Sequence, residues 1–105
     1  MRDRRGVLML MYDVPSKSAV ERREYTHFRK AILQEGFIQL QESVYVRLYR
    51  NYSYACTDVE RIRSIAPEGG SVQLLPLSLN NFSSLITVRG SAFDMSMFSD
   101  DVVWL

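Results

Sequence analysis

A short apolar run near the start of the chain constrains the fold most. Val7–Tyr12 is continuously apolar, with Gly6 before it and Asp13-Val14-Pro15 after it. A run this short fits a strand that is buried on both faces of a sheet. Pro15 cannot donate a hydrogen bond to a neighbouring strand, so the strand should stop before it. The sequence therefore predicts a central strand that ends at Asp13.

Two amphipathic segments predict helices. Ser18 and Glu21 fit a capping box at the start of the first helix, and Gly36 is its expected stop. A second helix is expected over residues 54–65, ended by Pro67. The expected inner faces comprise Val20, Tyr25, Phe28 and Ile32 in the first helix, and Ala55, Val59, Ile62 and Ala66 in the second.

Alternating apolar and polar residues predict the remaining strands. Residues 37–41 and 44–50 give two short strands, or one long strand bent between them, and residues 71–77 and 85–89 give two more. The order is β-α-β-β-α-β with an extra C-terminal strand and a tail, which predicts an α+β, ferredoxin-like fold. Residues 1–90 would form this domain, and residues 91–105 a C-terminal tail, for which docking on a partner is one of two alternatives.

The predicted arrangement leaves one sheet face without a cover, because both helices of a ferredoxin-like fold lie on the other face. The chain has 105 residues, 47% of them hydrophobic. A core of this size is modest, so an uncovered apolar face would be costly. A second copy of the chain is the simplest cover, and the sequence therefore predicts a homodimer.

Composition excludes several other classes of protein. No apolar run approaches the roughly 20 residues that cross a bilayer, and the N-terminal segment has no small-residue cleavage site. Cys56 is the only cysteine and His27 the only histidine. An intrachain disulfide and a cysteine metal cluster are therefore excluded. The sequence also shows no acidic or nucleophilic partner that would make His27 catalytic. These features predict a cytoplasmic protein that does not contact membranes.

Charge is distributed unevenly although the formal net charge is +1. Residues 1–63 hold twelve of the thirteen basic and eight of the twelve acidic residues. The basic clusters either form solvated helix faces and ion pairs or follow a nucleic-acid backbone, whose phosphates arginine grips in two places. The candidate nucleic-acid-binding residues are Arg2, Arg4, Arg5, Arg22, Arg23, Arg29 and Lys30.

Asp13 is the acid with the best claim to a functional position. It stands at the carboxyl end of the predicted central strand, where a side chain projects toward a ligand crevice. The alternative is that Asp13 accepts hydrogen bonds from the following turn or helix. One carboxylate is a poor Mg²⁺ site, whereas two Asp13 side chains that meet across a dimer axis would be a better one.

The end of the chain mixes acidic and apolar residues. Asp94, Asp100 and Asp101 surround Phe93 and Phe98. This segment would either pack on its own domain or add a strand to the sheet edge of a partner. The predicted partner-docking residues are Val102, Val103, Trp104 and Leu105.

Several motifs in a fixed order resemble one protein family. The first strand ends in Tyr12-Asp13-Val14-Pro15, the basic helix after it ends in Glu35-Gly36-Phe37, and Gln41-Glu42-Ser43-Val44-Tyr45 fits a Gln-x-Ser-Val-aromatic signature. This pattern resembles the second CRISPR-associated protein family, the small adaptation subunit often called an endoribonuclease. It is most similar to members from type II systems, and Arg47 stands where the family has an acidic residue.

The resemblance implies a function in spacer acquisition. A ferredoxin-like homodimer would sit between two dimers of the larger integrase subunit, the first CRISPR-associated protein, and hold double-stranded protospacer DNA as a scaffold. An alternative is a metal-dependent endonuclease, acting on RNA or double-stranded DNA, with catalytic Asp13 from both subunits and Mg²⁺. The resemblance leaves open whether the chain is an enzyme. A further alternative is a ferredoxin-like regulatory or RNA-binding domain, in which Tyr45 and Tyr49 share a strand face.

Overall fold

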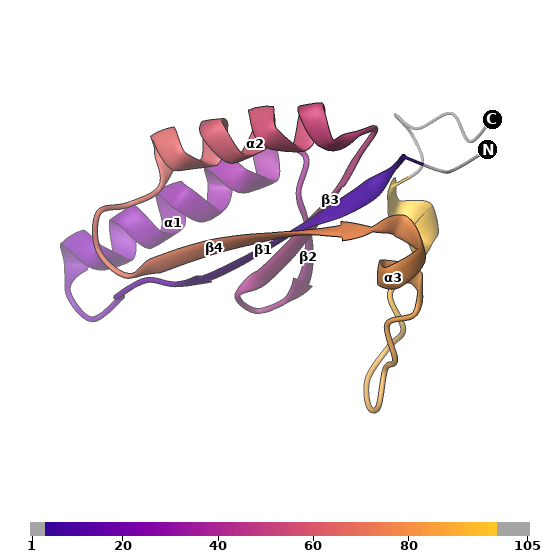
Figure 1. Cartoon of the computed structure of the whole chain (residues 1–105). Coiled ribbons are helices and arrows are strands. Elements are labelled where there is room, and N and C mark those ends of the chain that lie inside the picture. Colours follow the sequence, from indigo (N-terminus) through magenta and orange to yellow (C-terminus); the bar gives the residue numbers. More distant parts are fainter. Residues whose placement is uncertain (1–3, 99–105) are drawn as a thin grey trace.

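A single antiparallel sheet with two long helices on one face makes up most of the structure, a computed structural model that describes residues 4–98 (Figure 1). The strand order is β2-β3-β1-β4. This architecture confirms the predicted α+β, ferredoxin-like fold. The strands are β1 (Gly6–Asp13), β2 (Ile38–Gln41), β3 (Val44–Tyr49) and β4 (Ser71–Ser78); the helices are α1 (Ala19–Gln34), α2 (Tyr52–Ile65), α3 (Leu79–Ser83) and the 3-10 turn η1 (Met95–Phe98).

β1 is the central strand, as the apolar run predicted. It pairs with β3 on one side and with β4 on the other, so that Leu10 lies opposite both Tyr45 and Leu74. Leu8 and Leu10 are fully buried and belong to the core beneath the helices. Val7 is also fully buried, but it belongs to a second apolar cluster on the other face. Successive residues of β1 therefore serve two different layers.

The capping box at the start of α1 is present as predicted. The Ser18 hydroxyl accepts a hydrogen bond from the Glu21 N–H at 3.0 Å, and Glu21 Oε1 accepts one from the Ser18 N–H at 2.9 Å. The second bond holds the pKa of the Glu21 carboxyl below its usual range. The loop after Asp13 is thereby tied to the first turn of α1.

The inner face of α1 is narrower than the sequence predicted. Phe28 and Ile32 are buried and Tyr25 packs against the core, but Val20 is 58% exposed. At about 100° per residue, Val20 lies about 80° from Phe28 and about 120° from Ile32 around the helix axis. The prediction that Val20 faces the core is therefore wrong.

The predicted inner stripe of α2 is confirmed, but the helix begins two residues earlier than expected. Ala55 and Ile62 are buried. Asn51 is the N-cap, and its side-chain oxygen accepts a hydrogen bond from the Tyr54 N–H at 3.3 Å.

No helix within residues 4–98 is long and apolar enough to span a membrane.

The sheet face opposite the helices is partly covered by the chain's own C-terminal segment. Phe82 of α3 and Phe98 are buried there with Val7 and Val46. The ring centroids of Phe82, Phe93 and Phe98 lie 5.2–5.9 Å apart. The face that the sequence assigned to a second copy is therefore partly occupied, while the boundary between residues 90 and 91 stays a prediction.

Residues 85–89 do not form the predicted extra strand. They are irregular backbone followed by a bend, and Ile86 and Val88 are 82% and 94% exposed. Alternation of apolar and polar residues produces a strand only where a partner edge supplies hydrogen bonds. Among the described residues, no strand pairs with this segment. The prediction failed because the residue pattern does not say whether such an edge is within reach.

Candidate nucleic-acid interface

The predicted cationic face of α1 is exposed to solvent. Arg22, Arg23, Arg29 and Lys30 are all exposed residues of this helix. The ion pairs within residues 4–98 connect other residues, and none of these four cations has a carboxylate partner there. Their charges are therefore available to an anionic ligand.

Two of the four α1 cations are held in place by neutral groups. Arg22 Nη1 donates a hydrogen bond to the Lys17 carbonyl oxygen at 2.6 Å. Arg29 Nε donates one to the Tyr45 hydroxyl at 3.0 Å. Tyr45 is fully buried and stacks on Tyr12, with 5.8 Å between ring centroids. Arg29 is thus anchored to the core, whereas Arg23 and Lys30 have no such tie within residues 4–98.

The N-terminal arginines lie at a different place from the α1 face. Arg4 is exposed beside Asn51, Tyr52 and Ser53, at the start of α2. Arg5 is half-buried next to the first residue of β1.

Of the other predicted residues, Arg2 and the docking residues Val102, Val103, Trp104 and Leu105 lie outside the described part of the chain.

Asp13 is exposed at the end of β1. Its position alternates with Val7 and Met9, so its side chain is on the face opposite the helices. Within residues 4–98 its carboxylate makes no hydrogen bond or ion pair, because Ser18 and Glu21 cap α1 instead. The structural alternative for Asp13, as an acceptor for the turn or helix, is therefore not found in the described residues.

Gly70 holds the backbone beside Asp13, a feature that the sequence analysis missed. Its φ is +84°, and a Cβ there would lie 2.7 Å from Val14 Cα and collide with the Asp13 carbonyl oxygen. Only glycine permits this approach without strain. A glycine directly before a strand was the available signal.

The residues around Asp13 do not by themselves fit a magnesium ion. Within residues 4–98, no three His, Cys, Asp or Glu side chains gather closely enough to hold a metal. Mg²⁺ is usually held by one or two carboxylates together with waters and substrate phosphates. Because no such group surrounds Asp13 in the described part of the chain, a metal site there would need further ligands, such as Asp13 of a second copy.

Tyr45 and Tyr49, which the RNA-binding alternative would use to stack on bases, are buried. Tyr45 is fully buried and Tyr49 is 9% exposed. The Tyr49 hydroxyl donates a hydrogen bond to the Leu77 carbonyl oxygen at 3.2 Å, and burial raises the pKa of this phenol. Because both rings pack against the helices, neither can stack on a nucleic-acid base.

Comparison with known proteins assigns the chain to a family. A family model described as "CRISPR associated protein Cas2" matches residues 7–84. The chain belongs to the Cas2 family. It is 36% identical over 94 residues to a protein named CRISPR-associated endoribonuclease Cas2 from Streptococcus mutans serotype c (strain NN2025), which covers 90% of this chain and 87% of the relative. The protein of the same name from Ligilactobacillus salivarius (strain UCC118) is 41% identical over 83 residues, 79% of this chain and 82% of the relative. The resemblance seen in the motifs is thereby confirmed.

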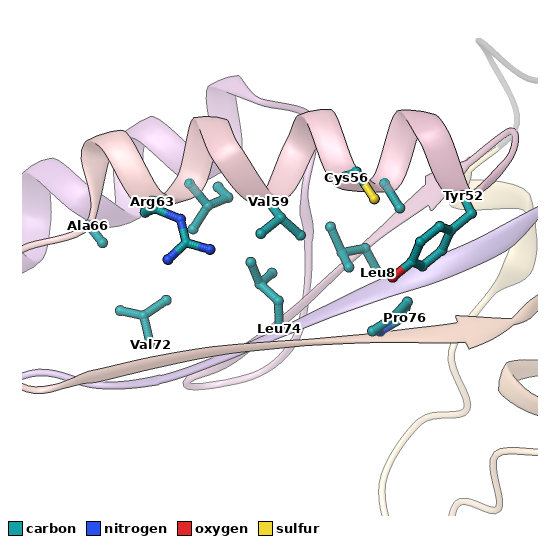
Figure 2. Close-up of a pocket in the computed structure, with 11 residues that line it drawn as sticks. Leu8, Tyr52, Cys56, Val59, Arg63, Ala66, Val72, Leu74 and Pro76 are labelled. Atoms are coloured by element: carbon teal, nitrogen blue, oxygen red, sulfur yellow. The ribbon is translucent and has the colours of Figure 1, made fainter.

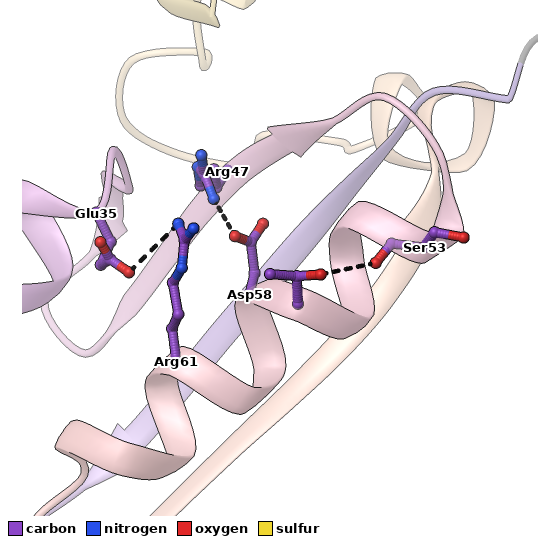
Figure 3. Close-up of polar contacts among 6 residues, drawn as sticks. Glu35, Arg47, Ser53, Asp58 and Arg61 are labelled. Atoms are coloured by element: carbon purple, nitrogen blue, oxygen red, sulfur yellow. Dashed lines mark hydrogen bonds and ion pairs between the residues drawn. The ribbon is translucent and has the colours of Figure 1, made fainter.

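A largely buried ion pair joins β3 to α2 in this Cas2-family chain. Arg47 of β3 points at Asp58 of α2 and forms an ion pair with it (Figure 3). The Asp58 side chain is 9% exposed and that of Arg47 is 30% exposed. This pair was not predicted from the sequence. The signal was an acid three residues after Ala55 and four before Ile62, inside the apolar stripe of α2.

A groove between α2 and the edge strand β4 is less suited to nucleic acid. Its cavity of about 440 Å³ is walled by Val59, Leu74 and other apolar side chains (Figure 2). Arg63 is the one cation among the residues that line it. Cys56 borders the groove and is exposed rather than packed in the core. The apolar walls offer little to a polyanion.

Loss of Arg47 should destabilise the fold, because Asp58 would be left buried without a partner. We expect Arg47→Leu to lower the free energy of unfolding by about 3 kcal/mol, measured by urea denaturation. Arg47→Leu combined with Asp58→Leu should regain most of this loss. Equal stability of the single variant and the unsubstituted chain would show that the ion pair has no structural role.

Proposed function

We propose that two copies of this Cas2-family chain form a scaffold that binds duplex DNA during spacer acquisition, between subunits of the CRISPR integrase. The main support is the exposed row of α1 cations that have no carboxylate partner within residues 4–98. Such a row can follow a phosphate backbone without reading its sequence. The apolar residues 102–105 would dock on the integrase.

The sheet face opposite the helices supports the dimer. Met11 lies opposite Val44, and Leu75 lies opposite Met9, so all four residues share this face. Leu75 is 46% exposed. Apolar residues gathered on one face of a small domain favour association with a second copy. Paired copies would also bring two Asp13 residues onto the same shared face.

The dimer can be tested with a charge on this face. We expect sedimentation equilibrium to give a dimer for the unsubstituted chain and a monomer for Leu75→Glu, because a carboxylate would be desolvated at the contact. Leu33→Glu is the matched control, since Leu33 of α1 is 39% exposed on the helical side. A monomeric unsubstituted chain, or a Leu75→Glu variant that dimerises normally, would contradict the assignment of this face.

Duplex binding can be tested on Arg23 and Lys30, the two α1 cations whose side chains make no hydrogen bond or ion pair within residues 4–98. We expect Arg23→Gln/Lys30→Gln to weaken binding of a labelled DNA duplex, measured by fluorescence anisotropy against salt concentration. Each lost phosphate contact should reduce the slope of log K against log salt by about 0.9. Because each substitution occurs twice in a dimer, the slope should fall by about two to four units.

The matched control removes two exposed arginines elsewhere, Arg63→Gln/Arg89→Gln. Its net charge equals that of the α1 variant, so a general charge effect would weaken binding equally in both. An unchanged slope for the α1 variant, or an equal loss in the control, would exclude α1 as the duplex-binding surface.

A second candidate function is a metal-dependent endonuclease. It is favoured by the exposed Asp13 carboxylate, which is without a partner in the described residues, and by relatives named endoribonuclease. In the proposed dimer, two Asp13 side chains would hold Mg²⁺, which would polarise a phosphodiester when bound. The small number of acidic groups makes the scaffold the better-supported function.

Asp13→Asn separates the two functions, because it keeps the size of the side chain and removes its charge. We expect this variant to bind duplex DNA and to support spacer integration with the integrase at the level of the unsubstituted chain. Cleavage of RNA and of DNA with Mg²⁺ is measured in parallel. Loss of integration by a variant that still dimerises and binds duplex would overturn the scaffold proposal.

A further inference from the structure

A cationic hollow lies between β3 and the first half of α2, far from Asp13. It has a volume of about 330 Å³. Tyr49 lines the hollow and pairs with Gly6, the first residue of β1. Asp13 is the last residue of the same strand. The eight residues of β1 place the two ends roughly 23 Å apart. The side chains that line the hollow include Arg47, Arg50, Tyr54, Thr57, Asp58 and Arg61.

Positive charge is in excess in this hollow. Asp58 is the acid among its lining residues, and Arg47 already pairs with it. Arg61 is 58% exposed and its Nη1 lies 3.9 Å from Glu35, a loose contact that is visible in Figure 3. Arg50 is exposed and has no ion pair or hydrogen bond within residues 4–98. Arg5 also lines the hollow and is engaged in another interaction.

The pairing of Arg47 with Asp58 orients one guanidinium within the hollow. Because a buried carboxylate holds Arg47 in place, its position does not depend on a ligand. A guanidinium can grip two oxygens of a phosphate at once. Arg50 and Arg61 line the same hollow and add two more positive charges to it.

An exposed aromatic ring at the rim indicates which phosphate compound fits. Tyr54 lines the hollow and is 53% exposed, whereas Tyr52 lines the separate groove between α2 and β4 (Figure 2). Cations beside an exposed aromatic ring are typical of proteins that bind single strands, whose unpaired bases stack on such rings.

We propose that Arg47, Arg50 and Arg61 bind a backbone phosphate of a single-stranded nucleic acid, while Tyr54 stacks on the neighbouring base. The proposal rests on the proposed nucleic-acid binding of this chain, but it uses a surface separate from the α1 cations. It gives the scaffold a site for an unpaired strand in addition to its duplex-binding face.

The test uses Arg50→Gln/Arg61→Gln and Tyr54→Leu in the full chain. Arg47 is kept, because its loss would leave Asp58 unpaired. The probe is a labelled oligothymidylate, and anisotropy is measured against salt concentration. For Arg50→Gln/Arg61→Gln we expect weaker binding and a salt slope reduced by up to about 0.7 for each chain that contacts the strand, because the three arginines share one phosphate. For Tyr54→Leu we expect a loss of roughly fivefold to a hundredfold at an unchanged slope.

Two controls accompany these variants. Arg63→Gln/Arg89→Gln, which removes the same charge outside the hollow, should bind the oligothymidylate like the unsubstituted chain. Duplex binding by Arg50→Gln/Arg61→Gln should also be unchanged. This second control separates the two proposals. If the duplex proposal is wrong, Arg23→Gln/Lys30→Gln will bind duplex DNA normally. If the hollow does not bind a single strand, Arg50→Gln/Arg61→Gln will bind the oligothymidylate normally.

Several results would overturn the proposal. One is unchanged oligothymidylate binding by Arg50→Gln/Arg61→Gln, and another is an equal loss of duplex binding, which would remove the preference for a single strand. If free thymidine monophosphate displaced the labelled oligothymidylate at the same concentration as unlabelled oligothymidylate does, the hollow would be a nucleotide site instead. Displacement by a peptide of residues 94–105 would indicate that the hollow binds an acidic chain segment.

Discussion

The double pairing of β1 is the constraint on which the rest of the structure depends. Because β1 lies between β3 and β4, its backbone pairs on both sides from Gly6 to Met11 and its side chains must serve both faces of the sheet. Leu8, Leu10 and Tyr12 pack beneath the helices, while Val7 and Met9 belong to the opposite cluster. The same alternation puts Asp13 on the face opposite the helices, away from the α1 cations.

Much of the fold could be predicted, because local patterns specify it. The apolar run of β1, the Ser18–Glu21 capping box and the spacing of Ala55 and Ile62 each have one favoured structure. Predictions failed where the outcome depends on distant partners. Residues 85–89 have the alternation of a strand but pair with none of the described strands. The start of α2 was missed for a local reason, because Asn51 caps the helix although asparagine is equally common in turns.

The candidate sites were predictable to a lesser degree. Helical spacing identified the exposed cations of α1, but it could not show that none of them has a carboxylate partner within residues 4–98. Asp58 is buried because Arg47 meets it across two elements, and no local pattern reports that meeting. The hollow beside this pair was missed for the same reason. Its arginines come from the residue before β1, from β3, from the loop after β3 and from α2, so only the fold brings them together.

The central claim is that a dimer of this Cas2-family chain holds one DNA duplex on its α1 cations. Native mass spectrometry of the chain mixed with a short duplex tests it most directly, because the mass gives the number of chains on each duplex. We predict a complex of two chains with one duplex, which dissociates as salt is raised. One chain on each duplex, or no complex at low salt, would contradict the account.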